Sequence, residues 1–123
     1  MDSERTDGQS YDLNELINLT KGDIHFYNKT LHSFVKVAGN VRSNIEKHLK
    51  KEHWQQVGEE SHKLISSARF LGMLEIASIC VQIEDNTLKS SNYDVVPGLV
   101  TNLLEKIDIV VPQIKNEYIS EKS

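Results

Sequence analysis

Residues 54–72, WQQVGEESHKLISSARFLG, contain the pattern that decides the fold of this chain. Small and apolar side chains recur there at alternating steps of three and four residues, which places them on one stripe of an α-helix. These side chains are Trp54, Val57, Ser61, Leu64, Ala68 and Leu71. At about 100° per residue, His62 points roughly 130° away from the centre of the stripe. The stretch therefore predicts a helix that buries one side and exposes an imidazole near its middle.

The face that His62 occupies is small and polar. Four residues lie on this face within one or two helical turns of the imidazole: Gln55, Gly58, Ser66 and Arg69. Lys63 follows His62 directly but is turned by about 100°. Near neutral pH an imidazole exists largely as an uncharged nucleophile. We therefore expect His62 to be an accessible nucleophile on a rigid helix.

The three-four periodicity continues on both sides of this stretch. It predicts a short helix opened by Asp12 with Glu15, and a long helix from Ile24 to about Lys50 that Thr20 or Asp23 caps. After the His62 helix it predicts two more, from Leu74 to about Lys89 and from an Asp94 N-cap to about Tyr118. In the last helix Pro97 falls in the first turn, and Pro112 predicts a kink. Short connections favour an all-α, antiparallel up-down-up-down four-helix bundle with a short N-terminal extra helix as a lid.

Composition limits the other possibilities. A chain of 123 residues corresponds to one domain, which we place at residues 11–120 after a disordered tail over residues 1–10. The net charge of -4 and the pI near 5.7 argue against nucleic acid as a partner. A single cysteine, Cys80, excludes an internal disulfide and fits a reducing compartment. No apolar run approaches membrane-spanning length, and no signal peptide is recognisable. We expect a cytoplasmic monomer.

Several of these residues also resemble a known family. The run from Ser61 to Leu64 and the pair Leu71-Gly72, with Cys80 and Glu84 downstream, resembles the histidine phosphotransfer (HPt) domain of multistep phosphorelays. In that family a small residue precedes the phosphorylated histidine, an apolar residue follows two positions later, and a Leu-Gly pair closes the helix. The resemblance extends over residues 11–118, which is nearly the whole chain.

This resemblance implies a function for His62. The histidine would accept a phosphoryl group from a receiver-domain aspartate and relay it to another. The implied partners are response-regulator receiver domains and a hybrid sensor histidine kinase. The chain would not be an ATP-dependent kinase, since it has no glycine-rich nucleotide loop. It would need no cofactor of its own, because Mg²⁺ is expected in the partner receiver domain.

The chain departs from the family at two positions. The family usually carries a lysine or arginine three residues after the histidine and a glycine after four, where this chain has Ile65 and Ser66. The available substitutes for the basic residue are Arg69, which leans back toward His62, and Lys63. Ser66 could donate its hydroxyl group to a phosphoryl group. We therefore expect Arg69, Lys63 and Ser66 to support the phosphate.

A second group of residues is assigned to partner docking. Gly58 has no helix-propensity reason to lie in this helix, and we interpret it as clearance for a docking protein. Gln55 and Glu59 lie near it, and Ile65 could form part of an apolar ring around the histidine. Phe70 could either join that ring or pack under the N-terminal helix, and the sequence leaves this open.

Two other kinds of site were weighed. Glu59-x-x-His62 matches half of a di-iron motif, but the chain has no second Glu-x-x-His pair. Cys80 lies on the apolar stripe of its helix and has the position of a small hydrophobe, not of a nucleophile.

A rival function remains because Ile65 replaces the usual basic residue. The chain could be a pseudo-HPt module that binds receivers without carrying phosphate.

Overall fold

The computed structural model describes residues 10–121. All regular secondary structure in this part of the chain is helical. The elements are α2 (Asn14–Thr20), α3 (Ile24–Lys50), α4 (Trp54–Phe70), α5 (Leu74–Thr87), the 3₁₀ helix η1 (Tyr93–Val95) and α6 (Val96–Lys115). This confirms the all-α fold. The expected disordered tail lies outside the described residues, apart from Ser10.

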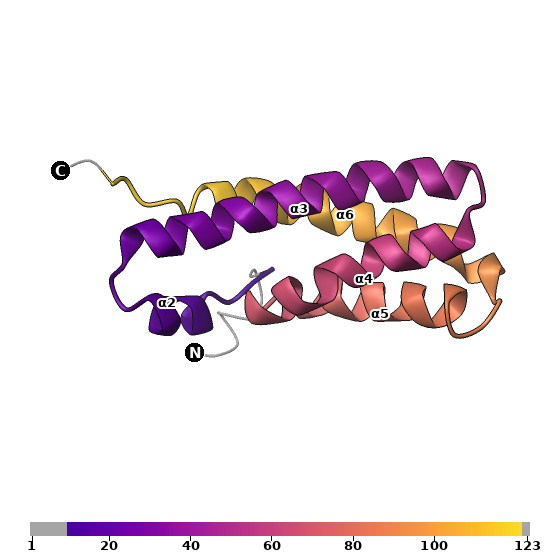
Figure 1. Ribbon diagram of the computed structural model, residues 1–123, viewed down its shortest axis with the longest axis horizontal. Helices are drawn as coiled ribbons and strands as arrows, with labels where there is room; N and C mark the ends of the chain where they lie inside the picture. Colours follow the sequence, from indigo (N-terminus) through magenta and orange to yellow (C-terminus); the bar gives the residue numbers. More distant parts are fainter. Residues whose placement is uncertain (1–9, 122–123) are drawn as a thin grey trace.

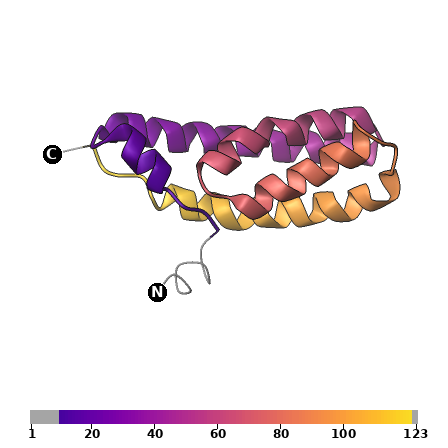
Figure 2. The same cartoon turned by 90° about the horizontal axis from the view of Figure 1, so that it is seen from below.

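The four long helices form a closed ring of neighbours. Helix α3 packs against α4, α4 against α5, α5 against α6, and α6 returns to α3. Figures 1 and 2 show the four helices side by side, with α2 at the end of the bundle where α3 begins. With 17 and 14 residues, α4 and α5 are shorter than α3 with 27 and α6 with 20. The predicted bundle with a short N-terminal helix is confirmed.

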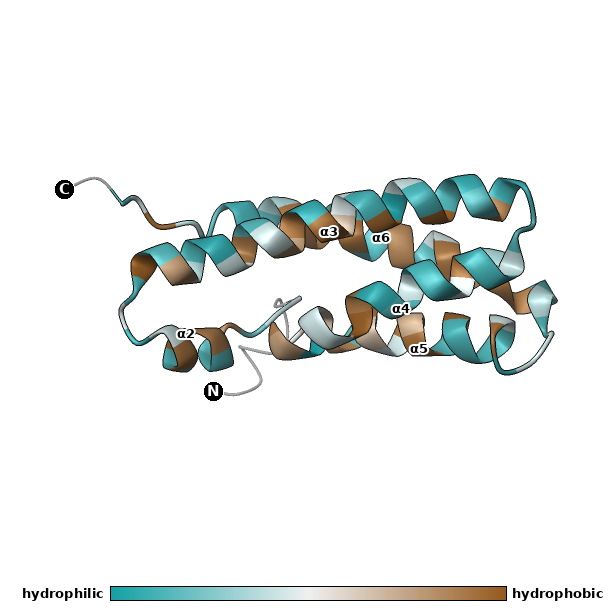
Figure 3. Cartoon of the chain, in the orientation of Figure 1, coloured by the Kyte–Doolittle hydropathy of each residue, from teal (hydrophilic) through white to brown (hydrophobic). Residues whose placement is uncertain are grey.

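Each long helix buries one apolar side. Figure 3 shows the corresponding separation of hydrophobic and hydrophilic residues along the helices. Burial of apolar surface is the main contribution to the stability of such a bundle. The largest fully buried side chains include Leu31, Ile45, Leu64, Leu71, Met73, Ile83, Leu103 and Ile114. Every member of the stripe that begins at Trp54 is buried, except Trp54 itself, which is half-buried.

Local signals place most of the helix boundaries. The Asp23 side chain accepts a hydrogen bond from the Phe26 N–H at 3.0 Å, so Asp23 caps α3 as one of the two predicted candidates. The Asp12 carboxylate accepts the N–H of Asn14 at 3.0 Å, but α2 begins only at Asn14. The helix then continues to Thr20. The Thr20 side chain is buried, and its hydroxyl donates a hydrogen bond to the Leu16 carbonyl at 2.9 Å.

The last helix begins later than expected. Asp94 lies inside η1, and α6 starts at Val96 with Pro97 in its first turn. Pro112 lies within α6, which continues to Lys115. A proline removes one internal hydrogen bond from the helix. The buried apolar residues on both sides of Pro112, Val110 and Ile114, keep the helix packed in the bundle.

The turn between α4 and α5 is locked onto the N-terminal segment. Gly72 has a φ of +72°, a conformation that favours glycine, and an added Cβ would lie 2.5 Å from the backbone N of Asp12. The same N–H of Asp12 donates to the carbonyl of Leu71 at 2.9 Å. At the other end of this segment, the Tyr11 hydroxyl donates to Glu117 at 2.5 Å. These contacts hold the lid segment against the C-terminal ends of α4 and α6.

Helix α4 lies close to the end of α5 at Gly58. A Cβ built on Gly58 would lie 2.1 Å from Oγ1 of Thr87 and 2.8 Å from Cγ of Leu88. Real Cβ atoms do not come this close to their neighbours, so a side chain at this position would force Thr87 and Leu88, or the helix that carries them, to shift. Gly58 therefore determines the distance between α4 and α5.

Two glycine substitutions should separate packing from helix propensity. We expect Gly58→Ala to destabilise the chain by about 1–3 kcal/mol, because the methyl group overpacks the α4–α5 contact. Gly39→Ala, in α3, should stabilise it by about 0.5–1 kcal/mol, since no atom lies within 4 Å of the added Cβ. Urea denaturation of both variants measures the difference, and a neutral or stabilising Gly58→Ala would contradict the close contact.

Candidate functional site

The His62 imidazole stands on the outer surface of α4, and its side chain is 66% exposed. Its Nδ1 atom lies 2.9 Å from Oε2 of Glu84 on α5, a carboxylate whose side chain is only 18% exposed. Within the described residues, no hydrogen bond or ion pair involves the other ring nitrogen, Nε2. A carboxylate at Nδ1 favours the tautomer with the proton on that nitrogen, which leaves the Nε2 lone pair available.

The contact with Glu84 follows from how the two helices run. Helices α4 and α5 are antiparallel neighbours joined by a short turn. Gly58 and His62 are one turn apart on α4, while Leu88 and Glu84 are one turn apart on α5. Gly58 approaches Leu88, so the next turn of each helix brings His62 beside Glu84. The glycine thereby contributes to the position of the nucleophile.

The lysine next to His62 is already paired. Lys63 Nζ lies 2.8 Å from Oε2 of Glu60, whose side chain is 11% exposed. The other carboxylate oxygen of Glu60 lies 3.4 Å from the Asn44 amide on α3, which holds it on the α3 side of α4. Lys63 must leave Glu60 before it can meet an anion on His62.

Arg69 and Ser66 are both exposed on α4. Arg69 lies about 10 Å along the axis from His62 at 1.5 Å per residue. The arginine lines a cavity at the lid end of the bundle, together with Tyr11, Asp12, Glu15, Phe70 and Glu75. Among the described residues, none lies within ion-pair distance of its guanidinium group. The structure thus places Arg69 on the expected face, but within residues 10–121 the imidazole forms no hydrogen bond or ion pair with the side chain of Arg69, Ser66 or Lys63.

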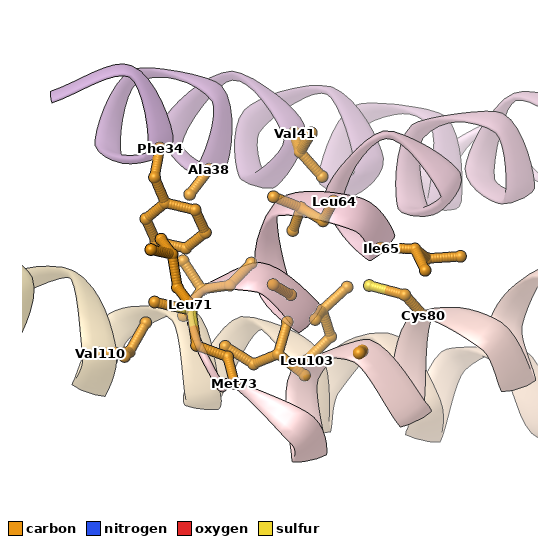
Figure 4. Close-up of a cluster of buried hydrophobic side chains, with 14 of the residues drawn as sticks. Phe34, Ala38, Val41, Leu64, Ile65, Leu71, Met73, Cys80, Leu103 and Val110 are labelled. Carbon is orange, nitrogen blue, oxygen red and sulfur yellow. The ribbon is translucent and has the colours of Figure 1, made fainter. Parts of the chain in front are cut away.

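Ile65 does not face the solvent, so its assignment to an exposed apolar ring is wrong. Its side chain is 7% exposed and belongs to the core cluster, where Figure 4 shows it beside Cys80 and Leu64. The physical reason is that α4 packs against both α3 and α5. Its buried arc is therefore wider than the apolar stripe defined by periodicity.

The interpretation of Gly58 as clearance for a docking protein also needs correction. Gly58 is buried, and the space beside it is filled by Thr87 and Leu88 of the same chain. The two other residues assigned to docking, Gln55 and Glu59, are exposed and joined by a 3.0 Å hydrogen bond. They remain on the surface one or two turns before His62.

The structure also shows where Phe70 and Cys80 lie, neither of which the sequence assigns to the site. Phe70 is half-buried and lines the lid cavity with the N-terminal segment, in agreement with the packing alternative. Cys80 is fully buried, and burial together with the negative charge of Glu84 raises the pKa of its thiol to about 12. A thiol with this pKa is not a nucleophile near neutral pH.

Residues 10–121 contain no group of three or more His, Cys, Asp or Glu side chains arranged to hold a metal ion. In the same range, no helix combines the length and apolar character needed to cross a membrane.

Glu84 is a candidate site residue to which the sequence alone assigns no role. It belongs to the pattern that resembles the family, but its contact with His62 depends on which turn of α5 lies beside the imidazole. The signal in the sequence was the glycine at position 58, because a glycine inside a helix often marks a close contact with a neighbouring helix. Its partner, Leu88, becomes evident only from the helix pairing.

Comparison with known families agrees with this geometry. A family model described as the Hpt domain matches residues 29–117, which is most of the chain, and the chain belongs to this family. Neither the curated proteins nor the solved structures yield a match. Membership implies histidine phosphotransfer and makes the chain a phosphotransfer module rather than a kinase. Domains of this family interact with receiver domains and kinases.

Proposed function

We propose that this chain is a phosphorelay intermediate. It accepts a phosphoryl group on His62 from the aspartate of one receiver domain and passes it to the aspartate of another. The observation that carries the proposal is the exposed imidazole with Nδ1 held 2.9 Å from Glu84 and Nε2 without a partner among the described residues. An exposed nucleophile on a convex surface suits a reaction in which a partner provides the cleft.

The transfer needs no base on this chain. The Nε2 lone pair attacks phosphorus, and the bond between phosphorus and the aspartyl oxygen breaks as the electron pair leaves with the carboxylate. The ring keeps its Nδ1 proton and becomes a phosphorylated imidazolium. The positive charge of this ring develops next to the Glu84 carboxylate, which stabilises it. The reverse sequence of events delivers the group to the next receiver.

The remaining parts of the reaction come from the partner and from flexible side chains. Mg²⁺ would be held by the receiver domain, where it neutralises charge on the transferring group. On this chain, Arg69, Lys63 and Ser66 are our candidates for contacts with the phosphoryl oxygens. Arg69 is the strongest, because Lys63 is engaged by Glu60 and a guanidinium group binds phosphate with two donors.

A second function is favoured by one specific observation. Ile65 occupies the position of the usual basic residue and is buried, so no charge replaces it at that place. A pseudo-HPt module would use the same surface to bind receivers without carrying phosphate. Transfer of label from a phosphorylated receiver separates the two functions.

The first expected outcome concerns the nucleophile. Incubation with a ³²P-labelled receiver domain should produce acid-labile, alkali-stable label on the wild-type chain and none on His62→Gln. The control variant His32→Gln, on the exposed surface of α3, should be labelled like wild type. Label retained in His62→Gln would assign the phosphate to another residue, and no label on the wild type would favour the pseudo-HPt function.

The second concerns Glu84 as a positioning residue. Glu84→Ala should slow phosphotransfer about ten- to a hundred-fold, which corresponds to loss of a charge-assisted contact. Glu84→Gln keeps an oxygen acceptor for the Nδ1 proton and should lose less. ¹⁵N NMR of the His62 ring provides a direct readout, in which the Nδ1–H tautomer of wild type should give way to Nε2–H in Glu84→Ala. An unchanged tautomer and rate would remove Glu84 from the mechanism.

The third concerns the basic residues. At saturating receiver concentration, Arg69→Ala should slow transfer by about five- to thirty-fold, as expected for one exposed contact to a phosphoryl group. Lys63→Ala should have a smaller effect, because Lys63 must first break its 2.8 Å pair with Glu60. Rapid-quench measurement of both variants decides the order. Equal rates for wild type and Arg69→Ala would mean that the receiver supplies all the positive charge.

A further inference from the structure

A large apolar side chain lies exposed beside the nucleophile. Leu88 is 40% exposed at the end of α5, although its Cγ would be only 2.8 Å from a Cβ on Gly58. Gly58 precedes His62 by one turn, and Leu88 follows Glu84 by one turn. Leu88 is therefore about 6 Å along the helix axes from the contact between His62 and Glu84. The turn of α4 before Gly58 begins with Trp54, which stacks on Tyr93 at 4.9 Å.

The position of Leu88 determines what must cover it. A stable protein–protein interface buries about 800 Å² on each partner, which corresponds to a disc of roughly 16 Å radius. A receiver whose aspartate reaches Nε2 of His62 places the centre of that disc on the imidazole. Leu88 then lies near the centre, where apolar contacts contribute most to binding.

The other exposed leucine on α5 provides a contrast. Leu74 is 70% exposed, more than Leu88, but it lies at the opposite end of the helix. It is ten residues from Glu84, or about 15 Å along the axis, which places it at the rim of the same disc. Contacts at a rim contribute little to affinity. The two leucines thus differ in their distance from His62 and not in their chemistry.

The charges near Leu88 leave a small acidic excess. Lys89 pairs with Asp85 at 3.4 Å and Lys63 pairs with Glu60, so these four charges are balanced. Glu59 lies on the same surface and is joined only to the neutral Gln55 among the described residues. A partner that covers Leu88 should therefore present an apolar contact with basic groups at its edge.

We infer that Leu88 is the apolar anchor by which this chain binds its receiver domains, with the partner centred on His62 and extending over the end of α5 rather than over the lid end of the bundle. The inference rests on the proposed function, since it takes the receiver as the occupant of this surface. Gly58 then serves both parts of the site. Its missing side chain allows Leu88 to lie against α4 next to His62 and brings Glu84 to the imidazole.

The test compares matched variants of the 123-residue chain. Purified receiver domains phosphorylated with acetyl phosphate and Mg²⁺ are screened, and the fastest donor to wild type is used at varied concentration. Leu88→Gln should raise KM about tenfold or more with kcat within about twofold, whereas Leu74→Gln should leave KM within about twofold of wild type. Leu88→Met, which keeps an apolar side chain, should restore most of the affinity.

Two further measurements separate docking from folding and from chemistry. Direct phosphorylation of His62 by phosphoramidate needs no docking surface, so it should be equal in wild type and Leu88→Gln. In the wild-type chain, methyl NMR signals of Leu88 should shift more than those of Leu74 when a beryllofluoride-activated receiver is added. This second measurement remains decisive if Leu88→Gln fails to fold.

The outcomes distinguish this inference from the proposed function. An unchanged KM in folded Leu88→Gln, a larger effect of Leu74→Gln, or methyl shifts confined to Leu74 would overturn the Leu88 anchor alone. Absence of label on wild-type His62 with every receiver and with phosphoramidate would overturn the proposed function, and the anchor with it. A raised KM only in Leu88→Gln, with unchanged phosphoramidate labelling, would establish the anchor.

Discussion

The close approach of α4 and α5 at Gly58 is the constraint on which the site depends. A Cβ at this position would lie 2.1 Å from Oγ1 of Thr87, so glycine lets the two helices pack with the Thr87 and Leu88 side chains in their observed positions. One turn further along, the same packing places Glu84 beside the Nδ1 atom of His62. Removing the close contact would separate the carboxylate from the imidazole even if both helices remained intact.

This arrangement divides one helix between stability and function. Leu64 and Ser61, on the inner side of α4, are fully buried, while His62 between them is largely exposed. A helix can serve both purposes because residues next to each other in sequence are separated by about 100°. Because the imidazole lies outside the core, the core can be packed for rigidity. In the proposed function, this rigid support would hold His62 in place for a partner that supplies the cleft.

Much of the fold could be predicted from local patterns. The three-four periodicity predicted α3 and α4 almost to the residue, and Asp23 was among the expected caps. The uncertain points were the ends, where α2 continues to Thr20 and η1 precedes α6. Burial of Thr20 determines the end of α2, and the connection from α5 to α6 determines the start of α6. Both depend on residues that are distant in sequence. Periodicity also placed Ile65 outside the core, since it defines the centre of a buried face but not its width.

The sequence by itself determined that the chain forms amphipathic helices, which side of α4 is buried, and that His62 lies on the opposite side. These properties follow from the spacing of apolar residues within one helix, so they need no knowledge of neighbours. Only the tertiary structure decided that Ile65 is buried, that Gly58 receives Leu88, and that Glu84 contacts the imidazole. Each of these depends on the distance and register between α4 and α5, which arise from packing of side chains across the two helices and not from either helix alone.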